Sequence, residues 1–271
     1  MHRFLIVSLL FVFVFSGCQQ QAPEEAAVAS EAPGAEPASA AEPAIDLEAV
    51  LAAAVNNPNR SAADKGRDEQ RKPAQVMAFA GLQPGMTVLD LFAGGGWYTE
   101  LLSYVVGDDG KVLSHNTRFF YDNYDDGTMA ARIADARLAN VVTHDREFGD
   151  LELEENSLDA IVAGMIYHDI QRMAEDPDDV FLQLCKALKP GGIMLITDHH
   201  APEGTGNAMA LESGGEHRIE EAFVVTQMED AGFELVGSSD VLRVPEDDRS
   251  KAFFRMDGAF TDRFVLLFKK P

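Results

Sequence analysis

The chain has 271 residues, of which 46% are apolar and 25% charged, a composition that is typical of a folded globular protein and excludes a fibrous or wholly disordered one. Its 45 acidic residues outnumber 22 Lys and Arg, which gives a formal net charge of −23 with no segregated basic segment. A phosphate backbone repels such a chain, so nucleic acid is not expected as a partner. The two cysteines, Cys18 and Cys185, are too few for a disulfide framework or a CxxC zinc site.

The first eighteen residues have the features of an export signal. Arg3 precedes an apolar run, Phe4 to Phe15, that is too short to span a bilayer. The run ends in small residues before Cys18, which resembles the lipobox of bacterial lipoproteins; ordinary secretion with an incidental cysteine is the alternative. A lipid on Cys18 would hold the protein at the periplasmic face of a membrane, and Gln19 favours the outer membrane.

The next segment, residues 19–58, is rich in Ala, Pro and Glu and lacks Lys and Arg. Because this composition cannot bury a core, it predicts a disordered tether in which only residues 45–55 could form a short helix. The sequence therefore predicts a signal peptide at 1–18, a tether at 19–58 and a folded domain at 59–271.

The folded part alternates between predicted strands and helices. Apolar runs predict strands near residues 87–92, 111–115, 139–143, 158–166, 192–197, 233–242 and 264–268. Helices are expected near residues 97–106, 129–138, 181–188 and 218–231. Five alternations with short connections require right-handed crossovers and a doubly wound, mainly parallel α/β sheet. Cys185 falls on the apolar face of its helix, which indicates a core position and not a reactive thiol.

A glycine-rich turn follows the first predicted strand. Such sheets bind ligands outside the carboxyl ends of their strands. The small residues of Asp90-Leu91-Phe92-Ala93-Gly94-Gly95-Gly96 let a ligand approach the backbone. The amide groups of this loop, with the helix start at Trp97, favour a carboxylate or phosphate. The alternative is a tight turn that binds nothing.

Further motifs occur in a fixed order along the chain: Val88 to Gly96, Gly110-Lys111-Val112, Asp145 after the third strand, Leu158-Asp159-Ala160, Leu188 to Gly192, and Ala231-Gly232-Phe233. Together they resemble the class I S-adenosylmethionine-dependent methyltransferases from about Ala74 to the C-terminus. A bacterial group of predicted methyltransferases is similar in residues 71–73, 97–100, 217–219 and 261–264. The resemblance implies a Rossmann-like, seven-stranded sheet with an antiparallel last strand, and S-adenosylmethionine as cofactor.

The resemblance also implies the cofactor-binding residues. The methionine end of the cofactor would be lined by Asp90, Ala93, Gly94, Gly95 and Gly96, and its adenine amino group would meet Asp145. The sequence departs from the family at Phe92, where many members have glycine, and at Asn116, where the family has an acid that binds the ribose hydroxyls. An amide makes weaker hydrogen bonds than a carboxylate, so we expect Asn116 to accept one hydrogen bond from the ribose.

The histidines are a separate signal. Six of them follow predicted strand ends or precede the last helix: His115, His144, His168, His199, His200 and His217. One interpretation is a set of satisfied polar residues in a wet crevice. The other is an acid/base or metal site in which Tyr167-His168-Asp169 lies beside Asp198-His199-His200. We take His168, Asp198 and His199 as the catalytic candidates and assign no metal ligand.

The charged stretch Asp64 to Arg71 would cap the cofactor side if it is helical; a solvated helix face is the alternative. The sequence as a whole predicts a lipid-anchored methyltransferase that acts on a small or surface-associated acceptor. The alternative function is an exported, non-catalytic protein of the same fold that binds a metal or another small ligand through its histidine-lined crevice.

Overall fold

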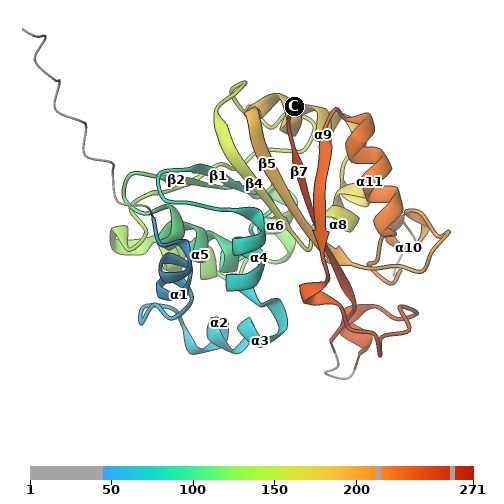
Figure 1. Ribbon diagram of the computed structural model, residues 1–271, viewed down its shortest axis with the longest axis horizontal. Coiled ribbons are helices and arrows are strands. Elements are labelled where there is room, and N and C mark those ends of the chain that lie inside the picture. The colour runs from blue at the N-terminus through green and yellow to red at the C-terminus, as the bar shows by residue number, and fades with distance from the viewer. Residues whose placement is uncertain (1–44, 212–214, 257–259) are drawn as a thin grey trace, which may run out of the picture. The chain divides into compact units, whose positions relative to one another are not determined.

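A seven-stranded sheet with strand order β3-β2-β1-β4-β5-β7-β6 runs through the computed structural model, which describes residues 45–211, 215–256 and 260–271 (Figure 1). The strands are β1 Thr87–Asp90, β2 Lys111–Ser114, β3 Val141–Thr143, β4 Leu158–Gly164, β5 Leu188–His199, β6 Glu234–Ser239 and β7 Arg263–Lys269. The first five pair in parallel, and β7 runs antiparallel to β5 and β6. The predicted fold class is confirmed.

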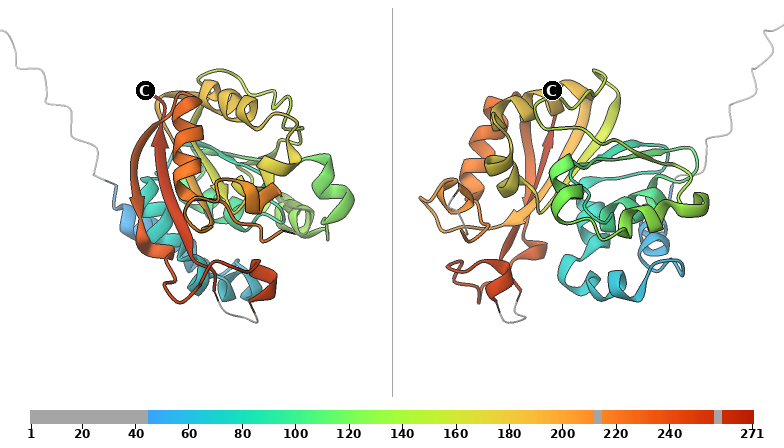
Figure 2. Two further views of the ribbon diagram at one scale, coloured as in Figure 1. Left: turned by 90° about the vertical axis from the view of Figure 1, so that its right-hand side faces the viewer. Right: turned by 180° about the vertical axis from the view of Figure 1, so that it is seen from behind.

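Helices cover both faces of the sheet (Figures 1 and 2). One core lies under α1 Leu47–Val55, α4 Pro73–Ala80 and α5 Trp97–Val106. The other lies under α8 Tyr167–Met173, α9 Pro177–Ala187 and α11 Glu221–Asp230. The remaining helices are α2 Ala62–Gly66, α3 Asp68–Arg71, α6 Arg118–Asn123, α7 Thr128–Ile133, α10 Ala208–Leu211 and the short 3-10 turns Ala134–Ala136, Asp240–Leu242 and Phe253–Arg255.

Strand β4 shows why the central strands are continuously apolar. Its alternate side chains enter opposite cores: Ala160 and Val162 pack under α5, whereas Ile161 and Ala163 pack under α8 and α9. All four are buried because helices cover both faces of the sheet.

Helix α9 has a capped first turn and a buried apolar face. The side chain of Asp176 accepts hydrogen bonds from the first turn, and Pro177 occupies the first helical position. Phe181 and Leu184 are buried, and Cys185 is half-buried at the margin of the same face. The apolar face predicted from sequence is therefore the face that packs on the sheet.

The folded unit begins earlier than predicted. Asp46 caps α1 by accepting from the amide of Ala49, and Leu51 and Ala54 are buried against α4 and α5. The predicted boundary at residue 59 lies too late, because α1 is largely apolar and Leu47, Val50 and Val55 also pack against this core. Residues 45–271 form one compact unit with its own cores. The signal peptide, Cys18 and the tether up to residue 44 lie outside the described residues.

Within the described residues, no helix combines the length and the apolar character that a membrane span requires.

Candidate functional site

A cavity of about 620 Å³ opens at the carboxyl ends of β1, β4 and β5. Strands β1 and β4 are neighbours at the point where the strand order reverses, which is the usual ligand site of an open α/β sheet. The walls come from α2 and α3, the loop after β1, the segment from α6 to α7, the start of α8, the end of β5, and the connection between β6 and β7.

Asp90 is the last residue of β1 and lines the cavity, although only 2% of it is exposed. Thr99 donates a hydrogen bond of 2.6 Å to its carboxylate. Burial raises the pKa of Asp90 to about 6, against the lowering effect of this hydrogen bond. The carboxylate therefore carries its charge at neutral pH and would attract a cationic group in the cavity.

The glycine loop lines the cavity with Ala93, Gly94 and Gly95, whereas Gly96 lies behind it. Gly96 has a φ of +81°, and a Cβ there would lie 2.7 Å from the side chain of Met129. The amides of Ala93, Gly94 and Gly96 all donate within the protein, to His115, Asn116 and Ala93. The expectation that these amides bind an anion is therefore wrong for these three groups.

Asn116 binds the glycine loop, and its predicted contact with the ribose stays a prediction. Its side-chain oxygen accepts from the Gly94 amide at 2.9 Å, and its side-chain nitrogen donates to the Gly94 carbonyl at 3.1 Å. The residue is buried and is not part of the cavity lining. Because both ends of the amide bind the neighbouring loop, Asn116 braces Gly94.

Asp145 is also displaced from its predicted place. It is exposed, accepts a hydrogen bond of 2.8 Å from the hydroxyl of Tyr121 on α6, and is not among the cavity-lining residues. Helix α6 follows β2, and the ring of its Tyr121 lies beside Asp145. The carboxylate of Asp145 is thus bound to Tyr121 outside the cavity lining, and its predicted adenine contact stays a prediction.

Helices α2 and α3 form the cap that the charged stretch Asp64 to Arg71 predicted. Asp64 pairs with Arg132 at 2.9 Å, and the indole nitrogen of Trp97 donates to the Asp64 carbonyl at 3.1 Å. The cap presents Arg67 and Arg71 to the cavity. The stretch Asp64 to Arg71 thus covers the cavity, as the cap interpretation predicted, and is not simply a solvated helix face.

Arg71 and Arg263 are cavity residues that our sequence interpretation missed, although both occur in the quoted methyltransferase motifs. The guanidinium of Arg71 lies 4.8 Å from the centre of the Trp97 ring. Among the described side chains it forms no hydrogen bond or ion pair. Burial lowers the pKa of Arg71 to about 10, so it stays charged at neutral pH. The guanidinium of Arg71 could therefore bind an anionic group of a ligand.

His168 lines the cavity from the first turn of α8. Its Nδ1 donates to Asp198 at 2.7 Å, and its backbone amide donates to the other carboxylate oxygen at 2.9 Å. Burial alone would lower the pKa of His168, but the charge and hydrogen bond of Asp198 raise it above the ordinary value. Asp198 is fully buried and is not in the lining, so it is a positioning residue and not a catalytic one.

His199 lines the cavity beside His168, with ring centres 5.8 Å apart. Its Nδ1 lies 2.6 Å from the hydroxyl of Thr261, and its ring stacks on Phe253. Burial, with the nearby charges of His168 and several arginines, holds the pKa of His199 well below its ordinary value. A neutral ring in this place forms part of the wall and is poorly suited to take up a proton.

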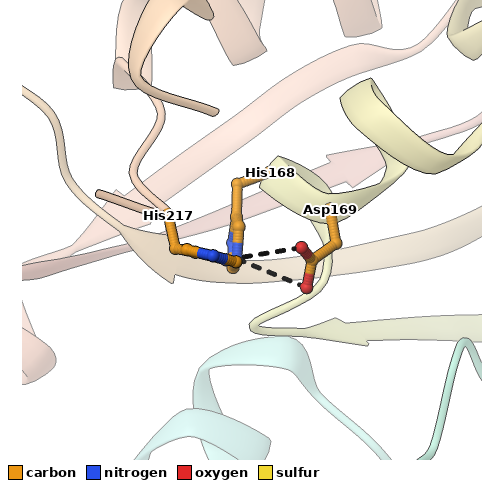
Figure 3. A group of neighbouring side chains, drawn as sticks. All are labelled: His168, Asp169 and His217. Atoms are coloured by element: carbon orange, nitrogen blue, oxygen red, sulfur yellow. Dashed lines mark hydrogen bonds and ion pairs between the residues drawn. The ribbon is translucent and has the colours of Figure 1, made fainter. Parts of the chain in front are cut away.

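The other predicted edge histidines separate into different environments. His115 accepts from the Phe92 amide at 3.2 Å and donates to the Arg146 carbonyl at 3.0 Å, and burial lowers its pKa to about 4. His200 contacts Arg243 at 2.6 Å instead of joining His199. His217, by contrast, contacts His168 at 3.4 Å (Figure 3). His168 and His199 therefore line the cavity, and His217 lies next to His168 outside the lining.

A family model described as a methyltransferase domain matches residues 82–236, which is more than half of the chain and runs from before β1 into β6. The chain belongs to the methyltransferase domain family. The cofactor of this family is S-adenosylmethionine, as the sequence motifs predicted. The matched region of the methyltransferase domain contains the glycine loop, Asp90, His168 and His199.

Curated relatives match the methyltransferase domain over part of their length. An arsenite methyltransferase of Halobacterium salinarum is 30% identical over 45% of this chain and 29% of its own. A ubiquinone/menaquinone biosynthesis C-methyltransferase of a Shewanella species is 28% identical over 46% of this chain and 47% of its own. The chain thus spans less than half the length of these relatives.

Solved structures share the fold. A SAM-dependent methyltransferase from Aquifex aeolicus superimposes with a TM-score of 0.56 and 22% identity over 84% of this chain and all of that one. An S-adenosylmethionine-dependent methyltransferase from Mesorhizobium loti gives 0.51 and 16% over 75% of this chain and 99% of that one. The comparisons lend no support to the alternative of a non-catalytic ligand-binding protein.

Proposed function

We propose that the methyltransferase domain transfers a methyl group from S-adenosylmethionine to a small acceptor bound beside His168. The observation that carries this proposal is the joint exposure of Asp90, the glycine loop and His168 to one cavity. Asp90 ends β1 and His168 follows β4, and these two strands are neighbours in the sheet. Donor and acceptor groups would therefore meet at the switch point of the strand order.

On the donor side, opposite charges would orient the methionine end of the cofactor. The carboxylate of Asp90 would attract its ammonium and sulfonium groups, and Arg71 would receive its carboxylate. Arg71 is suited to this role because its nearest aromatic partner is Trp97 and its guanidinium keeps all its donors for a ligand. The glycines let the cofactor approach the backbone of the loop after β1.

On the acceptor side, His168 would act as the base. Asp198 binds its Nδ1–H and thereby directs the lone pair of Nε2 away from the buried carboxylate. When bound, S-adenosylmethionine would supply the methyl group, with S-adenosylhomocysteine as the leaving group. As the new bond to the acceptor oxygen or nitrogen forms, Nε2 of His168 takes the acceptor proton. Phe253 and His199 would hold the acceptor from the side.

The size and charge of the cavity support a small acceptor. Small-molecule sites occupy about 300–1,000 Å³, and this cavity of about 620 Å³ falls within that range. The net charge of −23 argues against nucleic acid. The names of the curated relatives, an arsenite methyltransferase and a quinone-biosynthesis methyltransferase, also favour a small compound.

We further propose that a lipid on Cys18 anchors the protein at the periplasmic face of a bacterial membrane, where the acceptor is soluble or associated with the membrane surface. The lipobox-like sequence before Cys18 supports this location.

The function is tested by calorimetric titration of residues 45–271 with S-adenosylmethionine and S-adenosylhomocysteine. We expect binding in the micromolar range, about −8 kcal/mol, because the cavity offers a partner for each charged group of the cofactor. Gly94→Val should abolish binding, since a φ of +59° is strained for a branched residue and Gly94 lines the cavity that the cofactor would occupy.

Gly191→Val is the matched control. Gly191 has a comparable φ of +78° but lies near the amino end of β5, at the opposite edge of the sheet from the cavity. This variant should keep the affinity of the wild type. A well-folded wild-type domain that binds neither compound would contradict the proposed function.

A further inference from the structure

Three potential metal ligands converge on the acceptor side of the cavity (Figure 3). His168 and Asp169 lie in the first turn of α8, and His217 comes from the segment before α11. Nε2 of His168 lies 3.4 Å from Nδ1 of His217 and 3.4 Å from the Asp169 carboxylate. Nδ1 of His217 lies 3.5 Å from the same carboxylate. The three side chains therefore form a compact triangle, in which Oδ2 of Asp169 faces His168 and Oδ1 faces His217.

The size of this triangle fits a tetrahedral cation. Zinc binds nitrogen and oxygen at about 2.0–2.1 Å, so tetrahedral ligand atoms lie about 3.3–3.4 Å apart. An octahedral Mg²⁺ site has bonds of about 2.1 Å and therefore ligand spacings of only about 3.0 Å, and it prefers oxygen donors. Two imidazoles and one carboxylate suit zinc and similar transition metals better.

The surroundings of His168 support metal binding. Asp198 accepts from Nδ1 of His168 and is itself held by the backbone amides of His168 and His199. A carboxylate on the far nitrogen of a metal-ligating histidine fixes the tautomer that keeps the near nitrogen unprotonated. Nε2 of His168 thus points its lone pair at the centre of the triangle.

We propose that His168, Asp169 and His217 bind a divalent cation of the zinc type. Because His168 and Asp169 also line the cavity, the fourth coordination position faces the bound acceptor. This use of the metal rests on the proposed function: the cation would bind the acceptor oxygen, nitrogen or sulfur atom and lower its pKa. In the metal-bound protein His168 holds the cation, and the acceptor proton is lost when the acceptor coordinates.

Arg172 competes with the cation for these ligands. Its guanidinium donates to Asp169 and lies 3.5 Å from Nε2 of His217. The charge of Arg172 opposes a cation, and its bond occupies Oδ1 of Asp169; the exposure of about a third of the Arg172 side chain allows it to move away. Removal of the arginine charge should therefore strengthen metal binding.

The test is titration of residues 45–271, purified without a histidine tag, with Zn²⁺ in competition with a chromogenic chelator. We expect one bound ion per chain. Asp169→Asn and His217→Ala should each weaken binding by about 100-fold, and Asp198→Asn by about 10–100-fold. Arg172→Gln should tighten it. Bound Co²⁺ should give the intense visible absorption of a tetrahedral site.

His144→Ala is the matched control, because His144 is a half-buried histidine that contacts the Leu151 carbonyl away from the triangle. It should leave Zn²⁺ affinity unchanged. Absence of Zn²⁺ binding, or binding that His217→Ala does not weaken, would overturn the proposal. The Zn²⁺ titration contains no S-adenosylmethionine and tests only the metal site. The proposed function is tested separately, by cofactor binding to the metal-free domain. Failure of one experiment can therefore be told apart from failure of the other.

Discussion

At the scale of single residues, Phe92 explains how this loop departs from the family pattern without changing its path. Phe92 has a φ of +54°, in the left-handed region that favours glycine. This conformation costs roughly 1–2 kcal/mol in a residue with a Cβ. The ring stacks on Phe148 and meets Phe120 edge to face, with centroids 6.0 Å apart in each pair. Aromatic packing thus offsets the strain, and the loop keeps its glycine-like turn.

The negative charge of Asp90 should favour cofactor binding, but its burial makes the folded protein less stable. Its pKa is about 6 in the folded protein against 3.8 for an ordinary aspartate, so the folded state binds a proton more tightly than the unfolded state. The free energy of unfolding therefore falls as pH rises from about 4 to 6. Asp90→Asn should stabilise the protein by about 1–3 kcal/mol at pH 8, remove this pH dependence and abolish S-adenosylmethionine binding.

Urea unfolding at pH 4 and pH 8, with calorimetry at pH 8, measures these effects. Asp159→Asn is the control, since Asp159 accepts from the Thr87 amide and from Lys189 at the amino end of β4. It should lose some stability and retain cofactor binding. An Asp90→Asn protein that is less stable than the wild type at pH 8 would show that Asp90 is chiefly a structural hydrogen-bond partner.

At the scale of elements, Arg218 holds the connection between β6 and β7 in place. Arg218 is fully buried and pairs with the equally buried Asp247 at 2.8 Å. It also donates to the carbonyls of His200 and Lys251. This connection carries Phe253 and Thr261 to the cavity, where both contact His199. The quoted motif residue Arg218 therefore acts on the site from a distance, through the loop that it holds.

Replacement of Arg218 tests this role. Arg218→Met leaves Asp247 buried without its cation, so we expect a loss of about 3–5 kcal/mol in the free energy of unfolding, measured by urea denaturation. Arg118→Met is the control, because Arg118 and Asp122 form an exposed pair on α6. Exposed pairs contribute about 0–1 kcal/mol. Equal effects of the two substitutions would contradict a supporting role for Arg218.

At the scale of the whole molecule, we predict that the N-terminal segment anchors the protein and that the methyltransferase domain binds the cofactor and acceptor. If a lipid on Cys18 anchors the chain, Cys18→Ser should move the protein from the membrane fraction to the soluble fraction, as measured by fractionation and immunoblotting. Cys185→Ser should leave it in the membrane fraction, because Cys185 lies in α9. Membrane association of the Cys18→Ser protein would contradict the lipoprotein interpretation.

The site could be predicted only in part. Asp90, the glycine loop and His168 line the cavity as expected, because each directly follows a parallel strand and the ends of such strands share one edge. Asn116 and Asp145 also follow strands, yet their side chains bind Gly94 and Tyr121 instead. Arg71 and Arg263 reach the cavity from the cap and from β7, and no local pattern indicated their direction.

The amino-acid sequence alone determined the order of strands and helices and the ligand-binding edge of the sheet, because hydrophobic periodicity and turn residues act over a few neighbouring positions. Its ordered motifs indicated the family by resemblance. Side-chain partners depend on contacts between segments far apart in the chain. Tertiary structure alone placed His217 beside His168, 49 residues apart, and turned His200 away toward Arg243, although His199 and His200 are adjacent. Successive residues of a strand point to opposite faces, and that alternation separated these two histidines.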